Sequence, residues 1–136
     1  MSNKDILMLE TAKVWASASY CKRLQVGSVI AKDGRIISCG YNGTCPGDDN
    51  CCEDERGNTL STVSHAEANA IVFCAREGLS TEGCQLYITH SPCIECAKLI
   101  VTAGIVRVVY IEEFRDTSGI EFLKDRGIEA CQLSKQ

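Results

Sequence analysis

Two short stretches decide how this chain folds: Ser-His-Ala-Glu at residues 64–67 and Ser-Pro-Cys-Ile-Glu-Cys at residues 91–96. His65, Cys93 and Cys96 offer one imidazole and two thiolates, the ligand types that Zn²⁺ prefers. Structural zinc usually has four protein ligands, whereas a catalytic ion keeps one position for water. Glu67 stands two residues from the first ligand, where a carboxylate can take a proton from that water. The pattern therefore predicts a hydrolytic metal centre with Glu67 as its proton shuttle.

Each stretch is expected to begin a helix. Ser64 is a suitable N-cap for a helix over His65–Arg76. Pro92 fits the first turn of a second helix, because its missing N–H needs no partner there, so this helix would cover Cys93–Ala103. The amide dipoles of a helix N-terminus stabilise anions and favour thiolates over thiols. Two helix N-termini would then face one metal ion.

The rest of the chain indicates a mixed α/β order. An amphipathic helix is expected over residues 4–18, capped by Ser2 or Asn3, and Asp33-Gly34 is a strong hairpin signal. Strands are expected at residues 26–31, 35–40, 85–89, 107–111 and 128–133, and a last helix at 119–126. This alternation predicts a sheet with parallel portions, helices on both faces, and the metal at the carboxyl edge of the strands. The connection over residues 42–63 is long, which is typical of functional or disordered loops.

Composition bounds the class of protein. The chain has 136 residues, of which 45% are hydrophobic, and this fits a single domain over residues 1–136. We find no apolar run of about 18 residues, the length that spans a bilayer, and no signal-peptide pattern at the N-terminus. We therefore expect a cytoplasmic protein with no membrane partner. The formal net charge of −4 argues against a nucleic-acid partner, which needs a basic face.

Ten cysteines are many for a chain with no sign of export. Four lie in apolar stretches and are expected to be small core residues: Cys39, Cys74, Cys84 and Cys131. Three others cluster in the long polar loop, with Cys21 upstream: Cys45, Cys51 and Cys52. One interpretation is a second, structural metal held by Cys21, by Cys51 or Cys52, and by a further ligand. The alternative is a set of reduced thiols in a loop.

A family resemblance can be named on these residues. The pattern H-x-E…P-C-x-x-C is the signature of zinc-dependent base deaminases, and the chain resembles the cytidine-deaminase superfamily. Within it, the chain is similar to the deoxycytidylate (dCMP) deaminases, phage enzymes included, in these segments: Val26–Ile30, Gly40–Gly43, Cys51-Cys52, His65–Ile71 and Ser91–Lys98. The resemblance implies a three-layer α-β-α fold with a five-stranded mixed sheet flanked by helices. It also implies hydrolysis of dCMP to dUMP, which would supply dTMP synthesis.

The resemblance assigns roles to further residues. His65, Cys93 and Cys96 match the zinc ligands and Glu67 the proton shuttle. Substrate contacts are implied for Asn42 with the sugar, for the backbone near Ala66 and Ser91 with the pyrimidine edge, and for Tyr110, which could equally pack in the core. Asn42 could also be a turn residue, since Asn-Gly forms turns. The site of the 5′-phosphate stays open, with Lys22, Arg23 and His90 as candidates by charge.

Many members of this family are hexamers that dCTP activates and dTTP inhibits, with Mg²⁺ on the triphosphate. The resemblance implies a homo-oligomer here, with a regulatory nucleotide near Tyr41, Gly43, Phe73 and Arg76. As plain residues, Phe73 and Arg76 would be a core aromatic and a solvated charge. The chain also departs from the family pattern: His90 stands where another residue is common. The loop before His65 lacks the histidine-bearing insertion of some phage relatives, which weakens the case for a second zinc.

Three other functions remain possible from the sequence. A tRNA adenosine deaminase shares the zinc motif but needs a basic face for its polymeric substrate. A free-nucleoside cytidine deaminase typically has cysteine as its first ligand, where this chain has His65. A structural zinc module would need Glu67 or another cysteine as the fourth ligand.

Overall fold

The computed structural model describes residues 1–133 and contains four helices and five strands in that part of the chain. The helices are α1 (Asn3–Ala16), α2 (Ala66–Glu77), α3 (Ile94–Thr102) and α4 (Ser118–Asp125). The strands are β1 (Gly27–Lys32), β2 (Arg35–Tyr41), β3 (Gln85–His90), β4 (Arg107–Glu112) and β5 (Glu129–Gln132). The order of elements matches the sequence prediction.

The strands form one mixed sheet in the order β2-β1-β3-β4-β5. β1 is antiparallel to β2 and to β3, whereas β3, β4 and β5 run parallel to one another. Asp33 and Gly34, both with positive φ, form the tight turn between β1 and β2, as the Asp-Gly pair predicts. The parallel strands need crossover helices, which α3 and α4 provide.

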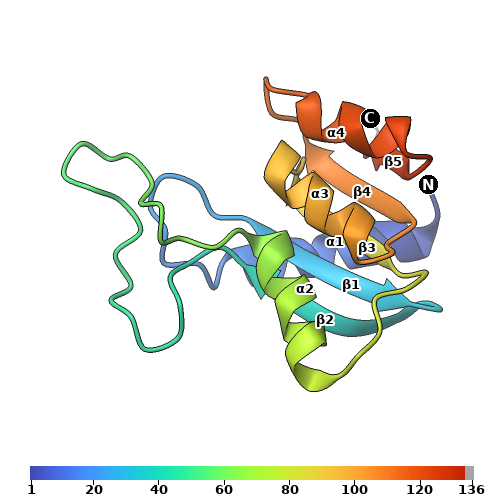
Figure 1. The fold of residues 1–136 in the computed structure, drawn as a ribbon, viewed down its shortest axis with the longest axis horizontal. Helices are drawn as coiled ribbons and strands as arrows, with labels where there is room; N and C mark the ends of the chain where they lie inside the picture. Colours follow the sequence, from blue (N-terminus) through green and yellow to red (C-terminus); the bar gives the residue numbers. More distant parts are fainter. Residues whose placement is uncertain (134–136) are drawn as a thin grey trace.

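Helices cover both faces of the sheet, so the molecule has three layers (Figure 1). On one face, α1 packs Met8, Leu9 and Ala12 against the sheet. On the other face, α2, α3 and α4 bury a larger cluster around Ala70, Ile100 and Leu123. Because both faces are covered, β1 and β3 have continuous buried runs instead of alternating exposure. The predicted three-layer fold with a five-stranded mixed sheet is confirmed.

Two helix starts differ from the prediction by one residue. His65 itself is the N-cap of α2, where Ser64 was expected, and Cys93 is the N-cap of α3 instead of its first residue. Both residues have extended backbone, which turns their side chains away from the helix axis. Each helix therefore begins directly after a metal-ligand candidate. Helix α1 ends at Ala16, two residues earlier than expected, and Ser2 caps it through a capping box with Asp5.

Residues 42–65, called here the β2–α2 loop, have no helix or strand and extend from one end of the sheet (Figure 1). Two isolated bridges hold the loop to itself, between Gly43 and Ser64 and between Glu53 and Thr59. Among residues 1–133, no helix is both long and apolar enough to span a membrane.

Candidate metal centre and cavity

The three predicted ligands meet at the carboxyl end of the parallel strands. His65 caps α2, and Cys93 and Cys96 lie at the start of α3, which follows β3. His65 Nδ1 lies 3.3 Å from Cys96 Sγ and 3.5 Å from Cys93 Sγ. All three ligand atoms lie within 4.8 Å of one another. The two segments, far apart in sequence, thus offer one nitrogen and two sulfurs to a common point.

Two glycines allow this close approach. A Cβ at Gly40 on β2 would overlap the carbonyl oxygen of Ala66, in the first turn of α2. A Cβ at Gly119 on α4 would overlap the carbonyl oxygen of Pro92, next to Cys93. The backbone around both ligand-bearing helix starts is therefore packed directly against neighbouring backbone, which fixes the ligands in place.

The electrostatics of the group favour a bound cation. Hydrogen bonds from the Cys96 thiol and then from His65 lower the pKa of Cys93 to about 3. The pKa of Cys96 is raised, first because its thiol donates to Cys93 and then because it is buried. The two sulfurs therefore share one proton, which a metal ion would displace on binding.

The donor set fits zinc. An imidazole and two thiolates suit this borderline-soft ion and leave its fourth position free. Within residues 1–133, no further histidine, cysteine or carboxylate side chain lies close enough to His65, Cys93 and Cys96 to be a fourth ligand. Glu67 is not a member of the group, which agrees with its predicted role as a shuttle.

Glu67 lies in the first turn of α2, with only 4% of its surface exposed. Burial is the main cause that raises the pKa of this carboxyl group to about 7, and the nearby His65 opposes the shift. A carboxyl group with such a pKa can both accept and release a proton near neutral pH. Such perturbed acids in a cleft are typical of functional sites.

A cavity of about 390 Å³ opens beside the ligands and Glu67. The α1–β1 segment (residues 17–26), the β2–α2 loop, and the ends of β3 and β4 all contribute to its wall. The predicted shuttle Glu67 lines it, as do three of the four predicted contacts with the sugar and base: Asn42, Ala66 and Ser91. Tyr110 does not line it; its ring is 3% exposed in the core, because it points into the α2–α4 side of the sheet. The predicted substrate contact of Tyr110 is therefore not supported, and its core-packing alternative holds.

Asn42 has a positioning role that the sequence did not reveal. Its Oδ1 accepts the N–H of Val26 at 2.9 Å, and its Nδ2 donates to the carbonyl of Leu24 at 2.8 Å. Asn42 therefore holds the α1–β1 segment against the end of β2. One Nδ2 hydrogen and one Oδ1 lone pair remain for a ligand.

Two aromatic rings, those of His90 and Phe114, form part of the cavity wall. His90 stacks on Phe114, with centroids 5.5 Å apart, and the Phe114 N–H donates to Ser91 Oγ at 2.9 Å. Sequence analysis missed Phe114. Its position just after β4, at the carboxyl edge of the sheet, is the signal that could have revealed it.

The three candidates for contact with the 5′-phosphate lie in two different places. Arg23 and His90 line the cavity. Lys22 lines another depression outside it, beside acidic residues of the β2–α2 loop. A negatively charged group bound in the cavity can therefore meet Arg23 and His90.

The predicted regulatory residues lie outside this cavity. Tyr41 stacks on Trp15, with centroids 6.3 Å apart, and together with Gly43 it lines a separate depression of about 250 Å³. Phe73 and Arg76 lie on the exposed side of α2. The sequence expectation that Phe73 would be a core aromatic is wrong, since 45% of its surface is exposed.

The second-metal hypothesis named Cys21, either Cys51 or Cys52, and a further ligand. The structure does not bring Cys51 to Cys21, but it places ligand atoms of Cys21, Cys52 and Glu53 within 4.8 Å of one another. Cys21 forms a disulfide with Cys52. Cys51 is exposed, and its thiol donates to the Glu53 carbonyl at 3.2 Å. Successive side chains of an extended segment point in opposite directions, so Cys51 faces outward when Cys52 faces Cys21. The alternative of reduced thiols is likewise wrong for Cys21 and Cys52.

The fold and the site define a class: an α/β domain with a His-Cys-Cys group that fits zinc and a buried acid. The family model described as the cytidine and deoxycytidylate deaminase zinc-binding region matches residues 1–112. The dCMP deaminase of cyanophage S-TIM5, solved with dCMP and dUMP, is 41% identical with a TM-score of 0.94, covering 98% of this chain and 99% of that one. The deoxycytidylate deaminase of Enterobacteria phage T4 is 34% identical, covering 98% of this chain and 91% of its own length.

ComE operon protein 2 of Bacillus subtilis is 41% identical over 103 residues, which is 74% of this chain but only 54% of that protein. This chain thus spans about half the length of that relative. The chain belongs to the cytidine and deoxycytidylate deaminase family, and its similarity to the phage enzymes confirms the predicted resemblance.

Proposed function

We propose that this protein hydrolyses dCMP to dUMP and ammonia. One observation carries the proposal: buried Glu67 and two of the three ligands, His65 and Cys93, line a single cavity together with Arg23 and His90. The cavity thus joins a hydrolytic centre to the guanidinium of Arg23, which can bind a 5′-phosphate, and to the ring of His90, whose pKa burial lowers. The likeness to phage dCMP deaminases supports the same substrate.

His65, Cys93 and Cys96 would hold the zinc ion. When bound, zinc lowers the pKa of its water from 15.7 to about 7 and so makes hydroxide available at neutral pH. Glu67 takes the proton of the attacking water and passes it to N3 of the cytosine ring. It then helps protonate the amino group at C4, which leaves as ammonia while a carbonyl forms at C4.

The other residues of the cavity would bind and orient the nucleotide. The first amides of α2, at Ala66 and Glu67, have no partner within the helix and can donate to the pyrimidine. The backbone of Ser91 would contact the other edge of the base, and the free hydrogen of Asn42 Nδ2 would contact the sugar. Arg23 and His90 would contact the phosphate.

Regulation and assembly belong to the same proposal. A triphosphate such as dCTP or dTTP, with Mg²⁺, would bind at the depression lined by Tyr41 and Gly43. Val72 and Phe73 expose 60% and 45% of their surfaces on α2, which supports contact with a second copy and assembly as a homo-oligomer, a hexamer by resemblance.

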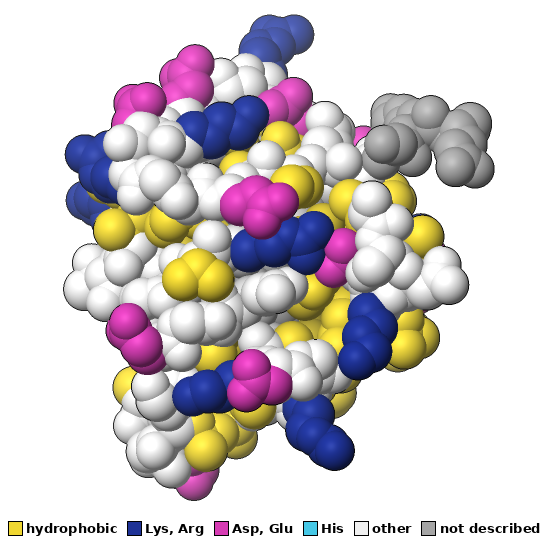
Figure 2. Space-filling view, turned by 90° about the vertical axis from the view of Figure 1, so that its right-hand side faces the viewer, with side chains coloured by type: hydrophobic (Ala, Val, Ile, Leu, Met, Phe, Trp, Pro, Cys, Tyr) yellow, Lys and Arg dark blue, Asp and Glu magenta, His cyan; other side chains and the backbone are white. Residues whose placement is uncertain are grey.

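Two of the alternative functions, a tRNA adenosine deaminase and a structural zinc module, have less support. A tRNA substrate needs a basic face, whereas the chain has a formal net charge of −4. The side of the molecule away from the β2–α2 loop, shown in Figure 2, has Lys and Arg side chains interspersed with Asp and Glu. A structural zinc module needs a fourth protein ligand, and the described residues supply three at this centre.

Ammonia release from the zinc-loaded protein tests the proposal. The substrates to compare are dCMP, CMP, deoxycytidine and a tRNA anticodon stem-loop, each with and without dCTP and Mg²⁺. We expect dCMP to be preferred and dCTP to increase its turnover. Release from the stem-loop alone would contradict the substrate, and no release from any of them would contradict the catalytic role.

A further inference from the structure

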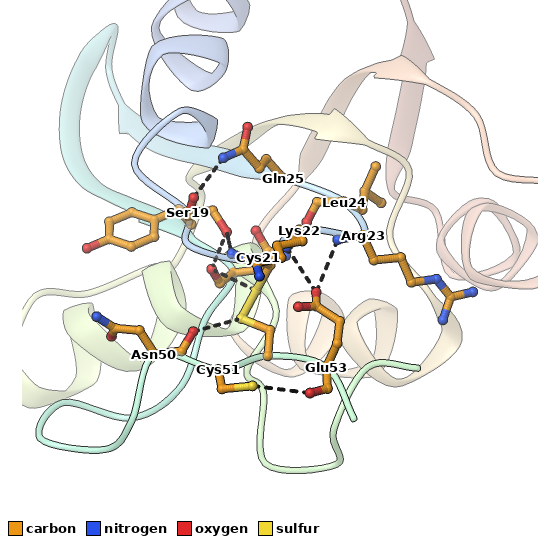
Figure 3. Close-up of a disulfide and its surroundings, with 12 residues drawn as sticks. Ser19, Cys21, Lys22, Arg23, Leu24, Gln25, Asn50, Cys51 and Glu53 are labelled. Carbon is orange, nitrogen blue, oxygen red and sulfur yellow. Dashed lines mark hydrogen bonds between the residues drawn. A yellow bond between two sulfur atoms is a disulfide. The ribbon is translucent and has the colours of Figure 1, made fainter. Parts of the chain in front are cut away.

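The Cys21–Cys52 disulfide joins two segments that surround the cavity (Figure 3). Cys21 lies in the α1–β1 segment, and Cys52 lies in the β2–α2 loop, 31 residues further along. Both side chains are buried, with 5% and 1% of their surfaces exposed. The bond is thus enclosed between the two segments.

The two segments form facing parts of the cavity wall. The α1–β1 segment contributes Cys21, Arg23, Leu24 and Val26, and the loop contributes Glu53, Thr59 and Val63. Arg23, which would contact the substrate phosphate, is two residues from Cys21. The covalent bond therefore fixes the distance between the two sides of the substrate entrance.

Asn42 connects the start of the loop to the α1–β1 segment through Leu24 and Val26, but few other contacts connect the middle of the loop to that segment. Glu53, next to Cys52, accepts the N–H groups of Lys22 and Arg23 at 3.0 and 3.1 Å, as Figure 3 shows. These bonds are exposed, and the loop has no helix or strand of its own. Segments with few buried contacts and exposed hydrogen bonds open most readily. Once the disulfide is broken, the middle of the loop would be held to Lys22 and Arg23 by Glu53, while Asn42 would still hold the start of the loop to Leu24 and Val26.

We propose that the Cys21–Cys52 disulfide forms and breaks reversibly and thereby sets the affinity of the cavity for its nucleotide. We call this disulfide the redox clasp. A dithiol reductant breaks the S–S bond by thiol–disulfide exchange, gives its two electrons and two protons to form two thiols, and closes into its own disulfide. Disulfides in reducing compartments are typically redox-sensing instead of permanent. The reduced loop can move away from Arg23, whereas the metal ligands and Glu67 stay on their helices.

The effect on affinity rests on the proposed function, but the bond and the loop motion do not. The experiment therefore has two independent readouts on the zinc-loaded protein, before and after treatment with a phosphine reductant. Peptide mapping without reductant identifies the disulfide, and trypsin cleavage after Arg56, in the exposed part of the loop, reports loop opening. Zinc content is measured in each state so that loss of the ion is not mistaken for loosening.

We expect reduction to speed cleavage after Arg56 and to raise the KM for dCMP by about tenfold, because a loose wall must be ordered on binding. The kcat should change little. Cys52→Ser should behave like the reduced protein under both conditions. Cys45→Ser is the matched control: this exposed loop cysteine is unpaired in the structure and does not line the cavity, so its redox response should persist.

The clasp is overturned by free Cys21 and Cys52 thiols in the untreated protein, or by equal cleavage after Arg56 in both redox states. Uptake of a second zinc by the reduced protein with unchanged KM would also overturn it, in favour of a structural metal on Cys21, Cys52 and Glu53. If Cys52→Ser does not fold, chemical reduction of the unsubstituted protein still gives each of these outcomes. Altered cleavage without any deaminase activity supports the clasp and contradicts the proposed function alone.

Discussion

Each end of the central sheet carries a buried carboxyl group, but the pKa of that group is lowered at one end and raised at the other. At the amino end of β3 and β4, Asp5 accepts two hydrogen bonds from Arg107, at 2.7 and 2.9 Å, and lies 2.8 Å from the Tyr87 hydroxyl. Hydrogen bonding to Arg107 is the main cause that holds the pKa of Asp5 far below its usual range. This carboxylate is satisfied and fixed in its charged form.

At the carboxyl end of the same strands, Glu67 forms no ion pair with an arginine or lysine among the described residues, and burial raises its pKa to about 7. Its protonation can therefore change near neutral pH, whereas that of Asp5 cannot. The comparison indicates that one end of the sheet is built for stability and the other for chemistry. Four substitutions test this difference.

Glu67→Gln should have the largest effect. The amide keeps the shape of the side chain but cannot accept a proton, so kcat should fall by about 10²–10⁴-fold, the usual contribution of a positioned acid or base. Zinc content and thermal unfolding should stay near those of the unsubstituted protein. Glu95→Gln is the control, because Glu95 is exposed on α3 and pairs only with Lys98. Near-normal turnover of Glu67→Gln would remove Glu67 from the mechanism.

Asp5→Asn should lower the free energy of unfolding by about 3 kcal/mol, the low end for one partner of a buried pair, because Arg107 keeps Glu129 as a second partner. Denaturant unfolding measures this change. Since the folded-state pKa of Asp5 is depressed, its contribution exists above the unfolded-state pKa of about 3.9 and is lost as the pH falls further. The difference between the two proteins should therefore shrink in acid.

Glu10→Gln is the matched control for Asp5→Asn. Glu10 is on the same helix, but its ion pair with Lys13 is exposed and should contribute about 0–1 kcal/mol. An equal fall in the free energy of unfolding for both substitutions would show that the buried Asp5–Arg107 pair stabilises the fold no more than an exposed ion pair does. Neither should alter kcat, since neither residue lines the cavity.

The sequence predicted the fold and the metal centre because both rest on local signals. The Asp33-Gly34 turn is two adjacent residues, and the ligand motif consists of two short segments, residues 64–67 and 91–96, each of which is recognisable by itself. Phe114 and the hydrogen bonds of Asn42 were missed because they join elements that are distant in sequence. The Cys21–Cys52 pairing was missed for the same reason: spacing cannot tell which of two adjacent cysteines faces inward.

Gly119→Ala tests whether α4 helps to hold the chemical end together. The added methyl group would overlap the Pro92 carbonyl and push on Cys93, so stability should fall by about 1–3 kcal/mol, the usual cost of overpacking. Zinc should also be lost faster to a chelator. Lys124→Ala, at an exposed position of the same helix, is the control. Unchanged zinc loss in a destabilised Gly119→Ala protein would mean that α4 supports the fold but not the metal centre.

Asn42→Ala should have the smallest effect and separates two roles of one side chain. It removes the two hydrogen bonds to Val26 and Leu24, each worth about 1 kcal/mol of folding stability, so the fall in kcat/KM caused by the loosened segment should not exceed about thirtyfold. If Asn42 only positions the α1–β1 segment, the loss should be equal for dCMP and for an analogue that lacks the 3′-hydroxyl. If it also binds the sugar, the analogue should lose less, because the contact is already missing. An equal loss would leave Asn42 as a positioning residue and place sugar recognition elsewhere in the cavity wall.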